Sequence, residues 1–336
     1  MAPKDDYWWS CIYSSLNNKD YNTLYGLTRE SLVDLMNDLF HIVYYGSLKI
    51  FERMLAMSIE YMSTNCTIFH LRTRYAMSSG KCHKELIYCL TVLGEDYHDQ
   101  VVQWPTENER HAISNRLNIQ RDLPYCVGII DGTLIEFFGY QPHKLELNTR
   151  KCFYGFNLVI ICDDQGLIRY AMHDEPGSQG DSCILRRSQW YSDIKLNLQN
   201  SKLDKRPFYI LSDKGILGID GIVTPFLETR PLTNKQLHFN HKIQIARALI
   251  ERVNNALKMR YPKIANQLKN TKEVNACLVI KAAVALHNDS ILRGNLSMYA
   301  NQYNDNSREF NNISAIHLPI LNTYISTRDC MILKVI

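Results

Sequence analysis

The feature that most constrains this chain is a short apolar run that meets a carboxylate within residues 125–138. Residues 127–130 are apolar, Asp131 follows directly, and Gly132 interrupts the pattern before a second apolar run at 134–138. This pattern predicts a buried β-strand that ends on a carboxylate. Because an unpaired buried charge costs several kcal/mol, Asp131 requires a partner base, hydrogen bonds or a metal ion.

The composition indicates an ordinary globular chain. It has 336 residues, of which 46% are hydrophobic and 21% charged, and its formal net charge is +4. This length predicts one large domain with a smaller one, or two domains, and the high apolar content with low net charge excludes a disordered chain. The small basic excess permits nucleic acid as a partner, but a mixed solvated surface would look the same.

The cysteines and the N-terminus bear on the compartment. The ten cysteines are scattered without a Cys-x-x-Cys pair, so the usual spacing of a zinc site is missing. The first ten residues, MAPKDDYWWS, lack the apolar core of a signal peptide, and no apolar run approaches the roughly 18 residues of a membrane-spanning helix. We therefore expect free thiols, a reducing intracellular compartment and no membrane partner.

Helical periodicity dominates the first third of the chain. After a short packed arm at residues 1–24, helices are expected from Thr28 as N-cap to Gly46, and then over 49–62, 68–76 and 81–93. The last two flank a Gly-containing turn and form a candidate helix-turn-helix. Its second helix would present Lys81, His83 and Lys84 to DNA. The alternative is a plain helical bundle with a basic surface.

A polar connector, which is expected to contain a helix over 107–117 with Thr106 as N-cap, leads into a region where strands alternate with helices. The strands are expected at 127–130, 134–138, 153–162, 167–173 and 208–213, and the helices at 181–190, 234–261 and 272–288. Asp163 and Asp164 fall in the turn of the hairpin and are interpreted as turn residues. The pattern beyond residue 290 is not informative.

Three carboxylates in this region suggest a common site. Asp131 and Asp213 each end a predicted strand, and Glu251 lies among apolar residues of the long helix, with Arg247 one turn before it. Taken alone, Glu251 is better explained by an i,i+4 ion pair with Arg247 than by catalysis. The order of two strand-terminal carboxylates and a helical one suits a site for divalent metal.

Hard oxygen donors of this kind suit Mg²⁺ or Mn²⁺, which keep coordination positions open for phosphate and water. Two such ions, about 4 Å apart, can activate an attacking hydroxyl and stabilise the leaving oxygen when a phosphodiester is cleaved. Three clustered anions also repel one another, so each carboxyl should have a raised pKa without metal. We expect two Mg²⁺ (or Mn²⁺) ions as cofactors.

A series of short motifs follows the same order along the chain as in a known family. They are Ile130-Asp-Gly-Thr133, Asn148-Thr-Arg-Lys151, Pro176-Gly-Ser-Gln-Gly-Asp-Ser182, Ser212-Asp-Lys-Gly215, Phe239-Asn240 leading to Arg247-Ala-Leu-Ile-Glu251, Lys258-Met-Arg-Tyr261 and Leu286-His-Asn288. The series resembles the PIF/Harbinger-type DDE transposases and the nucleases derived from them. The resemblance covers about residues 125–290, and residues 28–93 fit the helix-turn-helix of such proteins more loosely.

The resemblance implies an α/β fold, a ribonuclease-H-like mixed sheet with flanking helices, preceded by an all-α, helix-turn-helix-like domain. It implies that Asp131, Asp213 and Glu251 bind the metal ions and carry catalysis, and that Asp181 and Arg247 support them. Further expected DNA contacts are Arg150, Lys151 and Lys258, and Glu136 is a reserve ligand. The expected division is an arm (1–24), the helical region (25–95), a connector (96–124), the nuclease domain (125–290) and an extension (291–336).

The activity implied by the resemblance is metal-dependent cleavage of double-stranded DNA at element ends, with transfer of the strand to target DNA. Family members work with a Myb-like DNA-binding partner that aids nuclear entry. The absence of a run of about five or more Lys or Arg fits that dependence. We expect a nuclear protein, dependent on a partner and otherwise cytoplasmic, that could form homo-oligomers. The alternative is a domesticated, non-catalytic DNA-binding or chromatin-associated protein that retains the fold.

The chain departs from the family's pattern around its carboxylates. Leu134 stands where relatives usually have His after Asp-Gly-Thr, and Ser212 replaces the usual Gly before the second Asp. The stretch after Asp213 is Gly215-Ile-Leu-Gly218 in place of Gly-Tyr-Pro-Leu. The three carboxylates themselves are intact, so these departures bear on turnover rather than on the fold.

Overall fold

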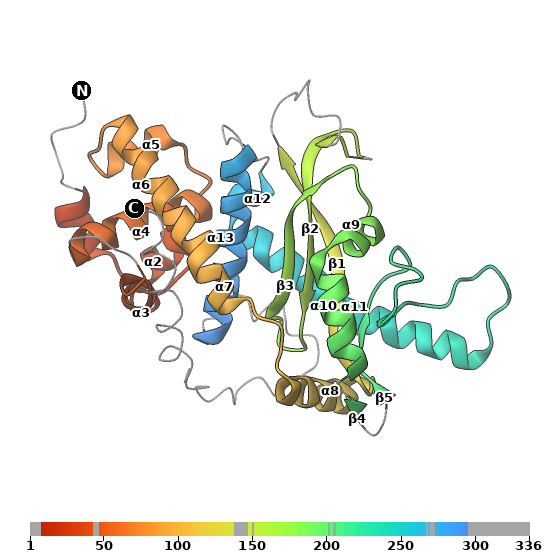
Figure 1. The fold of residues 1–336 in the computed structure, drawn as a ribbon. Coiled ribbons are helices and arrows are strands. Elements are labelled where there is room, and N and C mark those ends of the chain that lie inside the picture. Colours follow the sequence, from red (N-terminus) through yellow and green to blue (C-terminus); the bar gives the residue numbers. More distant parts are fainter. Residues whose placement is uncertain are drawn as a thin grey trace, which may run out of the picture.

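The computed structural model describes residues 8–42, 47–137, 147–149, 151–200, 202–203, 206–266, 268 and 273–294. A cluster of N-terminal helices lies to one side of a β-sheet, and helices cover both faces of that sheet (Figure 1). In these residues no helix combines the length and the apolar character needed to cross a membrane.

The N-terminal region is helical from its first described residue. Its elements are the π-helical turn η1 (Trp8–Ile12), α1 (Tyr13–Ser15), α2 (Asn18–Tyr25), α3 (Arg29–Phe40), α4 (Leu48–Ser63), α5 (Ile68–Arg74), α6 (Ser79–Thr91), the π-helical turn η2 (Val92–Tyr97), α7 (His98–Val101) and α8 (Glu107–Arg121). Side-chain oxygens of Asn17, Thr28, Thr67, Ser78 and Thr106 cap five of these helices. The arm expected at residues 1–24 therefore contains helices, and its Tyr13 and Tyr21 are buried.

A mixed sheet forms the second half of the fold. Among the described residues its strand order is β3-β2-β1-β6-β7, with β1 (Cys126–Phe137), β2 (Tyr154–Cys162), β3 (Ile168–Pro176), β6 (Tyr209–Leu211) and β7 (Ile222–Val223). β1, β2 and β3 pair antiparallel, whereas β6 pairs parallel with β1 and β7 parallel with β6. β4 (Lys202–Leu203) and β5 (Arg206–Pro207) form a separate small ribbon.

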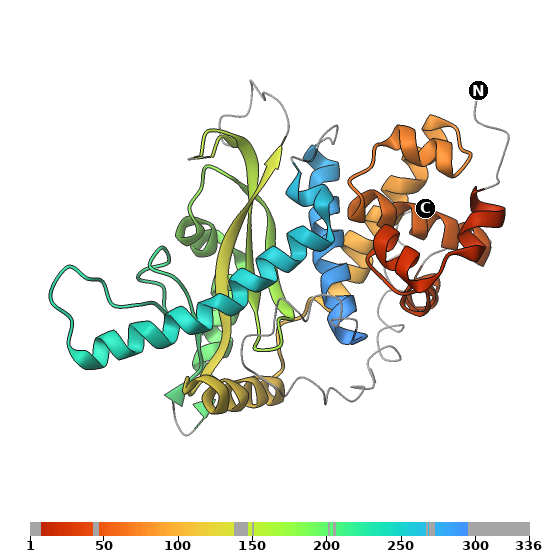
Figure 2. The same ribbon diagram turned by 180° about the vertical axis from the view of Figure 1, so that it is seen from behind.

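Helices pack on both faces of the sheet. α9 (Asp181–Arg187) and α10 (Gln189–Asn200) cover one face, where Ile130, Val159 and Ile161 pack against Ile184 and Trp190. The other face meets α11 (Asn234–Arg260) and α13 (Glu273–Leu292), with the short α12 (Pro262–Ala265) between them. Figure 2 shows α11 crossing the sheet, while its N-terminal part extends beyond the sheet edge.

Three predictions about local structure were wrong. β1 is one continuous strand and does not end at Asp131, because β2 pairs with it without interruption from Ile129 to Phe137. The helix expected over 181–190 is two helices, since Ser188 has extended backbone between α9 and α10. The loop expected after Asp213 contains β7, which adds to the parallel edge of the sheet.

α13 joins the sheet to the N-terminal helices. It packs against α6, η2 and α7 on one side and β3 on the other (Figure 1). Its buried Asn288 pairs with strand β3, because Oδ1 accepts from the backbone N–H of Ile168 at 2.9 Å and Nδ2 donates to the Ile168 carbonyl at 2.8 Å. Nδ2 also donates to the Val101 carbonyl at 2.9 Å. One amide therefore ties three elements together.

Replacing Asn288 with Ala should lower the free energy of unfolding by about 3 kcal/mol, because buried backbone groups of Ile168 and Val101 lose their partner. Chemical denaturation measures this change. Asn255→Ala, at an exposed position of α11, is the matched control and should change it by less than about 0.5 kcal/mol. Equal effects of the two substitutions would contradict this role of Asn288.

Candidate active site

The sheet brings Asp131 and Asp213 together. In the parallel pair of β1 and β6, Ile129 lies opposite Leu211. Asp131 follows Ile129 by two residues within β1 and so projects on the same face as Ile129, and Asp213 follows Leu211 by two residues. The strand expected to end on Asp213 ends at Leu211 instead, so Asp213 lies in the loop beyond β6. The parallel pairing of β1 and β6 brings the two carboxylates close enough for the charge of Asp213 to raise the pKa of Asp131.

Asp131 lies in the middle of a strand and is largely surrounded by protein. Its Oδ2 accepts a hydrogen bond from Asn254 Nδ2 of α11 at 3.1 Å. Burial raises the pKa of Asp131 from 3.8 to about 6; the nearby cation of Arg247 opposes this rise, and the carboxylates of Asp181 and Asp213 add to it. The charged form of Asp131 is thus stabilised by the Asn254 amide, by a backbone hydrogen bond at Gly132 and by the cation of Arg247, and it is opposed by burial and by two neighbouring carboxylates.

The loop that carries Asp213 is held by two hydrogen bonds. Asp213 Oδ1 accepts from the backbone N–H of Gly215 at 2.8 Å, and the carbonyl of Gly215 accepts from Ser182 Oγ of α9 at 2.6 Å. Ser212 is fully buried, and its Oγ has no hydrogen-bond partner. Ser212, one of the departures noted in the sequence, therefore places an unsatisfied hydroxyl next to Asp213.

Asp181 approaches β1 from the opposite face. A Cβ added at Gly132 would lie 2.3 Å from Asp181 Oδ1, so the carboxylate sits directly over this glycine. Asp181 Oδ1 also accepts from Nδ2 of the buried Asn157 on β2 at 2.7 Å. Since side chains alternate along a strand, Asp131 points toward α11 while Asp181 lies on the α9 side. Asp181 acts on Asp131 through its charge, across the strand.

Glu251 lies on α11, one turn before Asn254, with its side chain 55% exposed. It forms an ion pair with Arg247, whose Nη2 is 3.4 Å from Glu251 Oε1. Arg247 also influences Asp131 electrostatically, and its Nε is buried without a hydrogen-bond partner. Arg247 therefore lies between the charges of Glu251 and Asp131.

Lys258 of α11 contacts β1 just beyond Asp131. Its Nζ donates to Thr133 Oγ1 at 2.6 Å and to the Leu134 carbonyl at 3.0 Å. Burial lowers the pKa of Lys258, and the charge of Lys151 lowers it further. Two cations thus lie close together, and one of them, Lys258, also interacts with the charge of Asp131. Arg150, the third cation expected here, is outside the described residues.

The described residues contain no group of three His, Cys, Asp or Glu side chains arranged to hold a metal ion. The donors nevertheless suit a hard divalent cation, because Asp131 and Asp213 offer carboxylate oxygens and the buried Asn254 Oδ1 has no hydrogen-bond partner. Asp163 and Asp164 serve elsewhere. Asp163 Oδ1 accepts from two backbone N–H groups of its turn, and Asp164 binds Arg116 through two hydrogen bonds.

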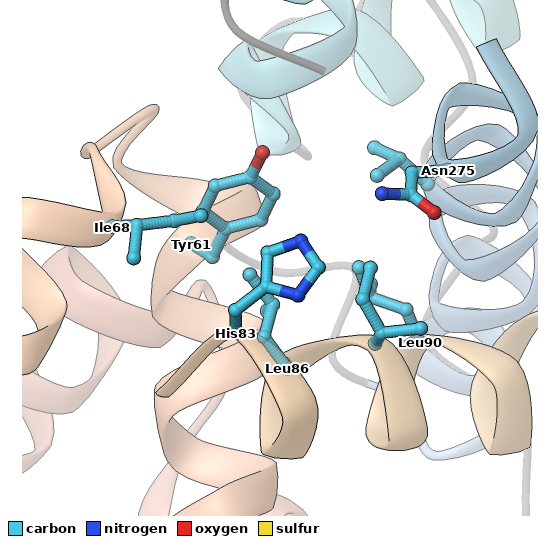
Figure 3. A pocket seen from close by; sticks show the side chains of 8 residues that line it. Tyr61, Ile68, His83, Leu86, Leu90 and Asn275 are labelled. Carbon is cyan, nitrogen blue, oxygen red and sulfur yellow. The ribbon is translucent and has the colours of Figure 1, made fainter. Parts of the chain in front are cut away.

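The candidate helix-turn-helix corresponds to α5 and α6. Lys81, His83 and Lys84 are exposed near the N-terminus of α6, and Lys81 lies 3.6 Å from Glu85. His83 projects into a small pocket of about 20 Å³, between Tyr61 and Asn275 (Figure 3). His83 therefore faces the junction with α4 and α13, whereas Lys84 does not line this pocket.

Sequence reasoning missed two residues of this site, Asn157 and Asn254. Both are buried amides that each donate to an Asp. For Asn254 a signal was present, because it follows Glu251 by three residues and so shares its helix face. For Asn157 the only signal was a polar residue inside a strongly apolar strand.

Gly132→Ala should lower the free energy of unfolding by about 2 kcal/mol, because the new methyl group would overlap the Asp181 carboxylate. The control is Gly80→Ala in α6, where an added Cβ meets nothing within 4 Å. In an Asp181→Ala background the cost of Gly132→Ala should shrink. A double-mutant cycle of denaturation midpoints measures this coupling, and additive effects would exclude the contact.

The raised pKa of Asp131 makes a prediction about pH. The unfolded chain releases this proton near pH 3.8 and the folded chain near pH 6. Without metal, the free energy of unfolding should therefore fall as the pH rises from 3.8 to about 6, and it should stay level above that pH. Asp131→Asn should remove this part of the fall. The stability difference between the variant and the original chain should therefore grow from pH 3.8 to about 6 and stay constant above it.

Denaturation curves at several pH values, in the presence of a chelator, measure this difference. Glu95→Gln, at an exposed carboxylate of η2, is the control. A stability difference that does not depend on pH would contradict the burial of Asp131.

Part of the chain is similar to known proteins. Residues 130–288 match a family model described as "DDE superfamily endonuclease". The chain is also 20% identical over 224 residues to "Putative nuclease HARBI1" of Xenopus laevis, a match that covers 65% of this chain and 62% of that protein. No solved structure matches the chain. The matched segment contains Asp131, Asp181, Asp213, Glu251 and Asn254, and it supports a DDE superfamily endonuclease domain with a nuclease-type function.

Proposed function

We propose that this chain is a divalent-metal-dependent DNA endonuclease of the Harbinger transposase type, which cleaves phosphodiesters at element ends and transfers the strand to target DNA. The observation that carries the proposal is the proximity of Asp131, on β1, to Asp213, in the loop that follows the adjacent parallel strand β6, beside the helix that bears Glu251. The similarity of residues 130–288 to DDE endonucleases supports it.

In this proposal Asp131, Asp213 and Glu251 hold two Mg²⁺ or Mn²⁺ ions, which would supply Lewis-acid activation of the attacking oxygen and stabilise the leaving oxygen. The remaining tasks fall to the chain itself. Asn254 orients the Asp131 carboxylate through its 3.1 Å hydrogen bond. Lys258 and Lys151 offer positive charge beside Asp131 for a backbone phosphate, and Asp181 fixes the opposite side of β1.

Glu251 must exchange its partner to join this site. Its carboxylate now pairs with Arg247, and the pair is solvent-exposed on the Glu251 side. When Glu251 turns toward Asp131, the guanidinium of Arg247 becomes available to a phosphate oxygen.

Binding of double-stranded DNA requires more surface than the carboxylate site. We assign part of it to the N-terminal helices, where Lys81 and Lys84 are exposed on α6, with His83 at the edge of the pocket beside them. A Myb-like accessory protein would add sequence recognition and nuclear entry, and a homo-oligomer would bring two element ends together. Arg150 belongs to the same proposed DNA contact as Lys151.

The second candidate function is a non-catalytic DNA-binding or chromatin-associated protein that retains the fold. The ion pair of Glu251 with Arg247 favours it, because the third carboxylate is engaged elsewhere. The unsatisfied Ser212 hydroxyl beside Asp213 favours it as well.

Nicking of supercoiled DNA in Mn²⁺ separates the two functions. Asp131→Asn, Asp213→Asn and Glu251→Gln should each lower the nicking rate by about a hundredfold or more, because each removes a charged ligand from the metal ions. Asp99→Asn, the exposed control in α7, should nick at the original rate. Equal nicking by the triple variant would exclude this site, and no nicking by the original chain would favour the non-catalytic function.

A further inference from the structure

The amide of Asn254 is used only in part by the contacts described above. The residue is 6% exposed, and its Nδ2 donates to Asp131 Oδ2 at 3.1 Å. Its Oδ1 is buried and has no hydrogen-bond partner. Oδ1 and Nδ2 of Asn254 are bonded to the same carbon, so Oδ1 must also lie close to the Asp131 carboxylate that Nδ2 contacts.

An unpartnered buried carbonyl oxygen is unfavourable, because it has lost its water without gaining a donor. Its neighbours on α11, Val253 and Leu257, are buried and apolar and offer no donor. Two cations of α11 that act near Asp131 do not bond this oxygen. Lys258 donates to Thr133 and Leu134, and Arg247 pairs with Glu251 through Nη2 while its unpartnered Nε makes no hydrogen bond to Asn254. The folded chain therefore places a bare oxygen donor beside the Asp131 carboxylate.

Amide carbonyl oxygens are ligands for hard divalent cations, as carboxylates are. We propose that Asn254 is a ligand of the divalent cation held at Asp131, binding it through Oδ1 while Nδ2 holds the Asp131 carboxylate in place. This inference rests on the proposed metal-dependent function. It adds a neutral ligand, which contributes an oxygen without adding a fourth negative charge to Asp131, Asp181 and Asp213.

A purely structural role for Asn254 makes a different prediction. If only Nδ2 matters, removing the amide or converting it to a carboxylate should have the same effect, because both changes lose the N–H donor. If Oδ1 binds the cation, the two changes should act in opposite directions. Leu removes both atoms at nearly constant shape, whereas Asp keeps the oxygen and adds a charge.

The test measures Mn²⁺ binding to the full chain without DNA, by calorimetry and by the rise in melting temperature that Mn²⁺ produces. Asn254→Leu should bind Mn²⁺ about tenfold more weakly, and its metal-induced rise should shrink. Asn254→Asp should melt lower than the original chain without metal, because its carboxylate repels Asp131, and should show a larger metal-induced rise. Asn255→Leu and Asn255→Asp, at the exposed neighbouring position, are the matched controls.

Each result decides the question. Undiminished Mn²⁺ affinity in Asn254→Leu overturns the inference and leaves the proposed function standing. If Asn254→Leu and Asn254→Asp weaken Mn²⁺ binding equally, Asn254 acts through its N–H group alone, and the inference that its Oδ1 binds the cation is wrong. Absence of Mn²⁺ binding to the original chain overturns the proposed function and the inference together.

Discussion

The arrangement of the site depends on one electrostatic constraint, a carboxylate in the middle of a paired strand. Asp131 cannot leave the sheet, because β2 pairs with β1 on both sides of it. Its charge is opposed by burial and by two further carboxylates, and the pKa near 6 reflects that balance. One amide donor and the charge of Arg247 are the stabilising contributions on the α11 side.

The same constraint accounts for Gly132 and for the two helical layers. Side chains alternate along a strand, so the residue after Asp131 faces the opposite side of the sheet. There the Asp181 carboxylate occupies the space that a side chain at position 132 would fill. Only a residue without a side chain leaves room for it. Asp131 therefore contacts α11 on one face of the sheet, and Gly132 leaves space on the other face for Asp181, the first residue of α9.

Much of this fold was predictable from the sequence because its signals are local. The caps at Thr28 and Thr106 and the apolar periodicity define helices that the structure confirms at their beginnings, although α3 ends at Phe40 and not at the expected Gly46. α11 ends within one residue of its predicted end. The continuity of β1 was not predictable, because it depends on pairing with β2, whose partner residues lie up to about thirty positions away. The contact of Asn254 with Asp131 spans 123 residues, and no local pattern encodes such a distance.

Glu251 is held in its present position by a weak ion pair with Arg247. An i,i+4 pair with one exposed partner contributes only about 0.3–0.5 kcal/mol, and screening by salt reduces that value. Loss of this pair is therefore a small cost beside the interaction of a carboxylate with a divalent cation. In the present arrangement Arg247 forms an ion pair with Glu251, and its positive charge also acts on Asp131. A divalent cation at Asp131 would change that balance directly, because it would repel Arg247 and attract Glu251 on the same helix face.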